Sequence, residues 1–175
     1  MKSKLLVLLV IVSAFLAIGC TTNDSGGNET SNPETDSQQD AAELYTQITG
    51  DDNYQQWELM PGTTEMEPGT GVHGNLVTVY VSDEAFAAVE DNAETMPNGS
   101  IILKEGYSSD GELQEILLMQ KIDGFDPEHN DWFWAAYSPD GEVAVEGQVE
   151  ACQDCHSGAQ DTDYVFTAEL TGNNS

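Results

Sequence analysis

The residues with the most specific chemistry in this chain are two cysteines and a histidine near its C-terminal end. They stand as Cys152-Gln153-Asp154-Cys155-His156, which is the C-x-x-C-H spacing that attaches c-type haem. Two residues between the cysteines, in a tight helical turn, let both thiols add to neighbouring edges of one porphyrin face, while the next imidazole points at the iron. The motif therefore predicts one covalent haem c, bound through Cys152 and Cys155 with His156 as an iron ligand.

Two other uses of this motif stay open. A short disulfide or a thioredoxin-like redox pair would lie at a strand-to-helix junction of a parallel arrangement, whereas antiparallel hairpins are expected here. A zinc site would need a fourth ligand, and His73 and His129 are the histidines outside the motif. An export signal at the N-terminus favours haem, because covalent haem attachment of this type takes place outside the cytoplasm.

The function of such a haem depends on its sixth coordination position. A methionine or a second histidine there gives a six-coordinate electron carrier, whereas an empty position lets nitric oxide, hydroxylamine or peroxide bind. Met119 stands in an apolar strand pattern typical of core residues, and His129 stands in a polar loop typical of solvated side chains. The full set of candidate ligands is Met60, Met66, Met96, Met119, His73 and His129.

The N-terminal segment has the pattern of an export signal. Two lysines, Lys2 and Lys4, precede a mostly apolar run of 14 residues from Leu5 to Ile18, and a small residue, Gly19, comes next. A helix needs roughly 20 apolar residues to span a bilayer, so the run indicates a signal peptide over 1–19 rather than a transmembrane helix.

The next residue, Cys20, predicts a lipid anchor. Ala17-Ile18-Gly19-Cys20 resembles the lipobox of prokaryotic lipoproteins, in which lipid is attached to the thiol. Buried acyl carbons contribute about 0.8 kcal/mol per methylene, so this lipid would hold the domain at the membrane. We therefore expect an exported protein anchored to the outer face of the cell membrane or on the periplasmic side. An ordinary signal peptide with an unmodified cysteine is the alternative.

The chain is strongly acidic, with 32 Asp and Glu against four lysines and a formal net charge of −28. All the acids come after Cys20, and only Lys104 and Lys121 among the lysines do so. This charge excludes nucleic-acid binding and favours a basic redox partner or a salty medium that screens the repulsion. Composition leaves open whether the acidity serves salt adaptation or docking.

The composition divides the remainder into a tether and one domain. Residues 20–40 are polar with almost no aliphatic side chain, which predicts a disordered tether. Residues 41–175 form the expected domain, which is mainly β (α+β): an antiparallel sheet with a few helices. Helices are predicted at 41–48 and 83–91, and strands at 76–81, 100–107, 113–122, 132–137 and 142–145. Ser82 is the expected N-cap of the second helix.

Over residues 72–166 the sequence resembles the cytochrome P-460 family. The haem motif is the most specific of the matching segments, and the others match by their order and spacing. In chain order these segments are His73-Gly74, Tyr80-Val81-Ser82, Met96 to Glu105, Met119-Gln120-Lys121, Asp131-Trp132-Phe133-Trp134, Tyr137, Asp140-Gly141, the haem motif, and Asp163-Tyr164-Val165-Phe166.

The resemblance implies a mainly β haem domain, usually a homodimer, with a five-coordinate c-type haem. In enzymatic members a lysine is cross-linked to the porphyrin edge and hydroxylamine is oxidised, while the related cytochromes c′-β lack the cross-link and bind nitric oxide or carbon monoxide. Lys104 matches the cross-linking lysine. Pairing of Lys104 with a haem propionate or with surface acids is the other reading. A hydroxylamine-oxidising enzyme, a gas-binding protein and an electron carrier all remain open.

The first prediction concerns anchoring. The native protein should partition with membranes, and Cys20→Ser should release it or leave it unprocessed, because the acylated thiol is lost. Fractionation of cells and then mass determination of the N-terminal peptide measure both results. Wild-type protein that is soluble and carries no lipid would contradict the prediction.

Overall fold

The computed structural model describes residues 39–167. The export signal, Cys20 and nearly all of the expected tether lie outside these residues, so the expectations placed on them stay predictions. Within residues 39–167, no helix has both the length and the apolar character needed to cross a membrane.

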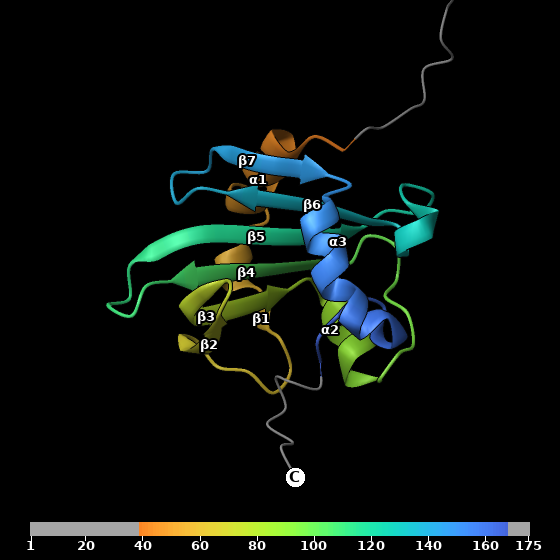
Figure 1. Cartoon of the computed structure of the whole chain (residues 1–175), viewed down its shortest axis with the longest axis horizontal. Coiled ribbons are helices and arrows are strands. Elements are labelled where there is room, and N and C mark those ends of the chain that lie inside the picture. The colour runs from red at the N-terminus through yellow and green to blue at the C-terminus, as the bar shows by residue number, and fades with distance from the viewer. Residues whose placement is uncertain (1–38, 168–175) are drawn as a thin grey trace, which may run out of the picture. The chain divides into compact units, whose positions relative to one another are not determined.

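One antiparallel sheet organises the described residues (Figure 1). Its strands have the order β1-β3-β4-β5-β6-β7, and β2 pairs with β3 beside β1. The strands are β1 (Glu58–Leu59), β2 (Glu67–Gly71), β3 (Gly74–Val81), β4 (Ile101–Tyr107), β5 (Leu113–Lys121), β6 (Trp132–Tyr137) and β7 (Val143–Gly147). The helices are α1 (Ala41–Thr49), α2 (Asp83–Glu90) and α3 (Glu150–His156), with short 3-10 helices η1 (Tyr54–Gln56), η2 (Pro127–His129) and η3 (Ser157–Thr162).

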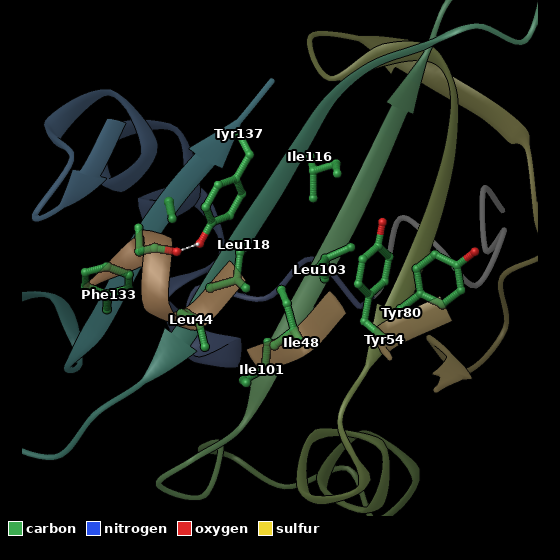
Figure 2. Packing of buried hydrophobic residues seen from close by; sticks show 12 residues of the cluster. Leu44, Ile48, Tyr54, Tyr80, Ile101, Leu103, Ile116, Leu118, Phe133 and Tyr137 are labelled. Atoms are coloured by element: carbon green, nitrogen blue, oxygen red, sulfur yellow. Dashed lines mark hydrogen bonds between the residues drawn. The ribbon is translucent and has the colours of Figure 1, made fainter. Parts of the chain in front are cut away.

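Side chains of the central strands alternate between two buried clusters, one on each face of the sheet. Leu103 on β4 pairs with Leu118 on β5, and both belong to the cluster beneath α1 and η1, which we call the α1 face (Figure 2). Ile102 pairs with Met119, and both belong to the cluster beneath α2 and α3, which we call the α3 face. Since both faces are covered at the centre, these strands are apolar on both sides.

Helix α1 is fixed to the sheet at its first turn. The Asp40 carboxylate caps the helix by accepting hydrogen bonds from the backbone N–H groups of Ala42 and Glu43, each at 2.9 Å. The Tyr137 hydroxyl of β6 donates to the Ala41 carbonyl at 2.9 Å, a buried bond drawn in Figure 2. A buried hydrogen bond of this kind contributes about 0.5–1.5 kcal/mol. The helix thus covers one end of the α1 face.

A buried acid, Glu105 of β4, occupies the other end of the α1 face. Only 1% of it is exposed, and it accepts hydrogen bonds from the Tyr54 hydroxyl at 2.7 Å, the Gln55 amide at 3.1 Å and the Tyr107 hydroxyl. Burial and the neighbouring Glu105 raise the pKa of the Tyr54 and Tyr107 hydroxyls above the ordinary range. The phenols therefore stay protonated as donors, and Glu105 fastens η1 to the sheet.

The α3 face is only partly covered by helices. Helix α2 begins at Ser82, whose hydroxyl accepts from the Ala85 backbone at 3.5 Å, and α3 crosses the strands beside it (Figure 1). Away from these helices the same face carries Val145, which is 43% exposed, and Leu117 and Ala136, which are partly exposed. Within the part of the chain that the structure describes, an apolar strip of the sheet is therefore left without a cover.

The fold confirms the predicted class and most of the predicted elements. The segment from Glu67 to Gly71 is the main difference, because no strand was predicted there whereas it forms the short strand β2. It pairs with β3 at the rim of the sheet, where a proline without an N–H is tolerated. Tertiary pairing overrides local propensity there.

Candidate functional site

Helix α3 presents the predicted haem-binding side chains on one stripe. Cys152, Cys155 and His156 stand at positions i, i+3 and i+4, which lie on the same face of an α-helix. Cys152 is partly buried against the cluster of the α3 face, Cys155 is exposed, and neither forms a disulfide in the described structure. Burial raises the pKa of the Cys152 thiol, with a smaller contribution from Cys155. The stripe thus points two thiols and an imidazole in one general direction.

The His156 ring is held in one tautomer and one orientation. Its Nδ1 lies 2.7 Å from the Tyr164 carbonyl oxygen, and because a carbonyl only accepts, Nδ1 must carry the hydrogen. The ring packs between Trp134, with centroids 4.8 Å apart, and Phe166, at 5.1 Å. Burial lowers the pKa of His156, and Lys104 adds to that effect although the bond to Tyr164 opposes it. The remaining nitrogen, Nε2, therefore offers a lone pair at neutral pH.

Lys104 lies on the same face of the sheet as His156. It pairs with Val79 of β3 and Leu117 of β5 and stands two residues from Ile102, as the expected alternation requires. Its charge acts on His156, so the two groups lie in one region.

His73 and Glu115 complete this polar group. His73 Nδ1 lies 3.8 Å from a Glu115 carboxylate oxygen. Burial, then the charges of Lys104 and His156, lower the pKa of His73 to about 4. Burial raises the pKa of Glu115, while Lys104 lowers it in part. The structure therefore brings Lys104, His73 and Glu115 to the face that α3 borders.

Residues inside and beyond the haem motif anchor α3, and these were not predicted. Gln153, one of the two residues between the cysteines, is 6% exposed, and its amide donates to the Asp126 carboxylate at 2.7 Å. Gln148 donates to the Phe125 carbonyl at 3.2 Å. Both bonds tie α3 to the loop between β5 and β6. Gln153 occupies one of the two positions of the C-x-x-C-H motif that can hold any residue. The motif therefore gives no indication that this side chain is buried.

A second unpredicted anchor holds the chain after η3. The Lys121 ammonium contacts both carboxylate oxygens of Asp163, at 2.8 and 2.7 Å, and lies 5.0 Å from the centre of the Trp132 ring. Only 1% of Asp163 is exposed. The residue after it, Tyr164, supplies the carbonyl that accepts from His156. The pair therefore lies next to the group that orients the imidazole.

The sequence model of the family described as Cytochrome P460 matches residues 51–167, which is well over half of the chain. The chain belongs to the cytochrome P460 family. No match was found among curated proteins. Membership confirms the resemblance that the ordered segments indicated, and it supports a c-type haem cytochrome. The roles of the individual site residues stay predictions.

The described residues fit the haem c that this family implies. The Trp134 indole N–H is buried without a hydrogen-bond partner among the described residues, beside the His156 ring. The apolar strip of Leu117, Ala136 and Val145 lies on the same face, where a flat porphyrin could cover it. No group of three His, Cys, Asp or Glu side chains in residues 39–167 could hold a metal ion by itself.

The six candidate sixth ligands lie in different surroundings. Met60, Met96 and Met119 are buried in the packing of the α3 face, as the strand pattern predicted for Met119. Met66 is 37% exposed. The His129 Nδ1 is 2.9 Å from the Asp126 carboxylate, so this ring is engaged within its own loop. The charges of Lys104 and His156 act on His73, which lies 3.8 Å from Glu115.

The second prediction uses the lowered pKa of His73. Its value in the folded protein, about 4, lies below the ordinary 6.5, so as pH falls through this window the unfolded chain takes up the proton first. The contribution of neutral His73 to stability is complete above pH 6.5 and is lost toward pH 4. His73→Gln should therefore lose less stability than wild type on acidification from pH 7 to 4.5, as measured by urea unfolding.

The control for this titration is Val72→Ala, because Val72 is 68% exposed in the same loop and does not titrate. It should have the wild-type pH dependence. A His73→Gln curve parallel to wild type would show that this imidazole titrates alike in both states, against the prediction.

Proposed function

We propose that this cytochrome P460 family member is an exported, mono-haem cytochrome that binds small nitrogen compounds at an open haem iron. Its haem c is covalently bound through Cys152 and Cys155, with His156 as the protein ligand of the iron. Hydroxylamine and nitric oxide are the proposed ligands, and hydroxylamine is the proposed substrate.

The observation that carries the proposal is the state of His156. The hydrogen bond from Nδ1 to the Tyr164 carbonyl at 2.7 Å leaves the Nε2 lone pair available, and such a bond raises the basicity of an imidazole ligand. Cys152 and Cys155 share its helical stripe. Haem bound there would supply an iron that coordinates a small nitrogen compound and takes up electrons from it.

Proton transfer is the task left to the protein. Glu115 is the candidate base, because its raised pKa brings it nearer to the range in which a carboxylate both accepts and releases protons. His73, whose Nδ1 lies 3.8 Å from a Glu115 carboxylate oxygen, is neutral at physiological pH and lies beside this base. Lys104 is the proposed residue at the porphyrin edge. Lys104 matches the cross-linking lysine of the family resemblance, and it lies on the sheet face that α3 borders.

The proposed partners come from charge and anchoring. The net charge of −28 favours a basic protein as the electron acceptor. Lipid on Cys20 would place the domain at the outer or periplasmic side of the membrane. A homodimer is the expected assembly, as the family resemblance implies.

The third prediction tests the cofactor. The wild-type protein, produced in a host that matures c-type haem, should carry one haem that resists acid-acetone extraction. The double variant Cys152→Ala/Cys155→Ala should lose it, because no thiol remains to bond the porphyrin. Haem staining of denaturing gels and intact mass measure this. His156→Ala should keep covalent haem but alter the absorption spectrum.

Three results would contradict the cofactor assignment. They are extractable haem, stoichiometric zinc in place of haem, and a disulfide between Cys152 and Cys155 in the mature protein.

The fourth prediction tests Lys104. Peptide mapping should find haem linked to a peptide that contains Lys104 and not to one that contains Lys121, whose ammonium is held by Asp163. Lys104→Ala should lose hydroxylamine oxidation while keeping the thioether-bound haem. Steady-state oxidation of hydroxylamine with an artificial electron acceptor measures this.

Other results would decide between the remaining functions. If Lys104 is unmodified and the ferrous haem binds nitric oxide, the protein is a gas-binding protein of the cytochrome c′-β kind and not the proposed enzyme. Failure to bind nitric oxide and carbon monoxide would leave an electron carrier. His73 is then the first candidate for the sixth ligand, since it lies with Glu115 on the face that α3 borders.

A further inference from the structure

A buried ion pair outside the haem motif is joined through one residue to the proposed iron ligand. We propose that Asp163, paired with Lys121, is a positioning residue that holds the Tyr164 carbonyl against His156 and so sets the donor strength of this imidazole. The inference rests on the proposed function, in which His156 binds the haem iron.

The backbone around Asp163 has a conformation that must be held from outside. Asp163 and Tyr164 have φ angles of 55° and 66°, in the left-handed region that residues other than glycine rarely adopt. These two residues end η3 and reverse the direction of the chain. The Tyr164 carbonyl thereby reaches His156, which lies eight residues earlier. Strained backbone of this kind persists only where its surroundings over-determine it.

Asp163 receives that support from several directions. Its carboxylate accepts hydrogen bonds from the Lys121 ammonium at 2.7 and 2.8 Å, from the Met96 backbone N–H at 2.7 Å and from the Asn130 amide at 2.8 Å. Its own carbonyl accepts from the Trp132 indole at 2.8 Å. These donors come from β5, β6 and two loops, so the residue is fixed in three dimensions.

The proposed positioning role gives a reason for two charged side chains in a buried position. Lys121 is 8% exposed and Asp163 is 1% exposed, and the Lys121 ammonium lies over the ring of Trp132, a member of the apolar cluster of the α3 face. Apolar side chains could anchor a chain end there, but they would not fix the direction of the next carbonyl. Directional bonds do fix it. The Trp132 indole holds the peptide that joins Asp163 to Tyr164, and the Val165 N–H, which shares a peptide with the Tyr164 carbonyl, donates to the Thr162 carbonyl at 3.1 Å.

The consequence for the haem concerns electron donation. A carbonyl that accepts from Nδ1–H makes the imidazole a stronger donor at Nε2. A displaced Tyr164 carbonyl would weaken the iron–histidine bond and favour the ferrous state. Loosening Asp163 should therefore lower the iron–histidine stretching frequency and make the reduction potential more positive.

The experiment compares variants of the complete haem-loaded protein. Asp163→Asn keeps the shape of the side chain and removes its charge, but it leaves the buried Lys121 ammonium unpaired. The double variant Lys121→Met/Asp163→Asn removes both charges, and it serves if the single variant fails to fold. Asn130→Gly removes one hydrogen bond and keeps the left-handed backbone that Asn130 adopts at φ 54°. Resonance Raman spectra of the ferrous protein and redox titration are the readouts.

The matched control is Tyr54→Phe. It removes one donor, at 2.7 Å, from a different buried carboxylate, Glu105, which lies on the α1 face of the sheet. It should lose stability without moving the iron–histidine band or the potential.

The expected result is a lower frequency and a more positive potential in Asp163→Asn and the double variant, with a smaller shift of the same sign in Asn130→Gly. The proposal is overturned if these variants lose stability while the band and the potential stay at their wild-type values, or if Tyr54→Phe shifts both equally. Wild-type protein tests the proposed function separately. Absence of covalent haem or of an iron–histidine band there would overturn that function, and this inference with it.

Discussion

A buried carboxylate, Asp163, is the constraint on which the architecture of the α3 face depends. It lies where β5, the loops around Met96 and Asn130, and the segment after η3 meet, and it accepts hydrogen bonds from all of the first three. Breaking a buried ion pair by removing one partner costs about 3–5 kcal/mol, a large part of the stability of a small domain. The segment that carries Tyr164 is therefore held at several points, by donors from β5, β6 and two loops.

Strand β4 separates two kinds of polar chemistry by one residue. Lys104 faces the α3 side with His73 and Glu115, and Glu105 faces the α1 side among phenols and an amide. Because β4 is paired on both edges, the backbone of neither residue can shift without moving the central sheet. A site built on such a strand is held more closely than one built on a loop. The sheet thus insulates the proposed haem face from the acid behind it.

The features that the sequence predicted correctly are those determined by local pattern, whereas contacts between distant segments were missed. Alternation and turn residues mark the strands from β3 to β7, and the spacing of Cys152, Cys155 and His156 fits one helical turn. The bond from Lys121 to Asp163 instead spans 42 positions, and each of these side chains reads as an ordinary surface residue in an acidic chain. The sequence showed Lys121 only as one of the two lysines beyond Cys20, whereas the structure buries it. Strand β2 was missed for the same reason, because pairing with β3 overrides its local preference.

The placement of the two lysines beyond Cys20 reconciles an acidic chain with neutral imidazoles. A charge of −28 would by itself favour protonation of His73 and His156, since a negative field stabilises the imidazolium. Both lysines instead project on the α3 side of the sheet, where burial and Lys104 together lower the pKa of both histidines. A protonated His156 could not bind iron, because its Nε2 lone pair would be occupied. Burial and Lys104 therefore determine the protonation of these histidines. The acidic residues elsewhere on the surface can serve salt adaptation or docking without changing the charge at the site.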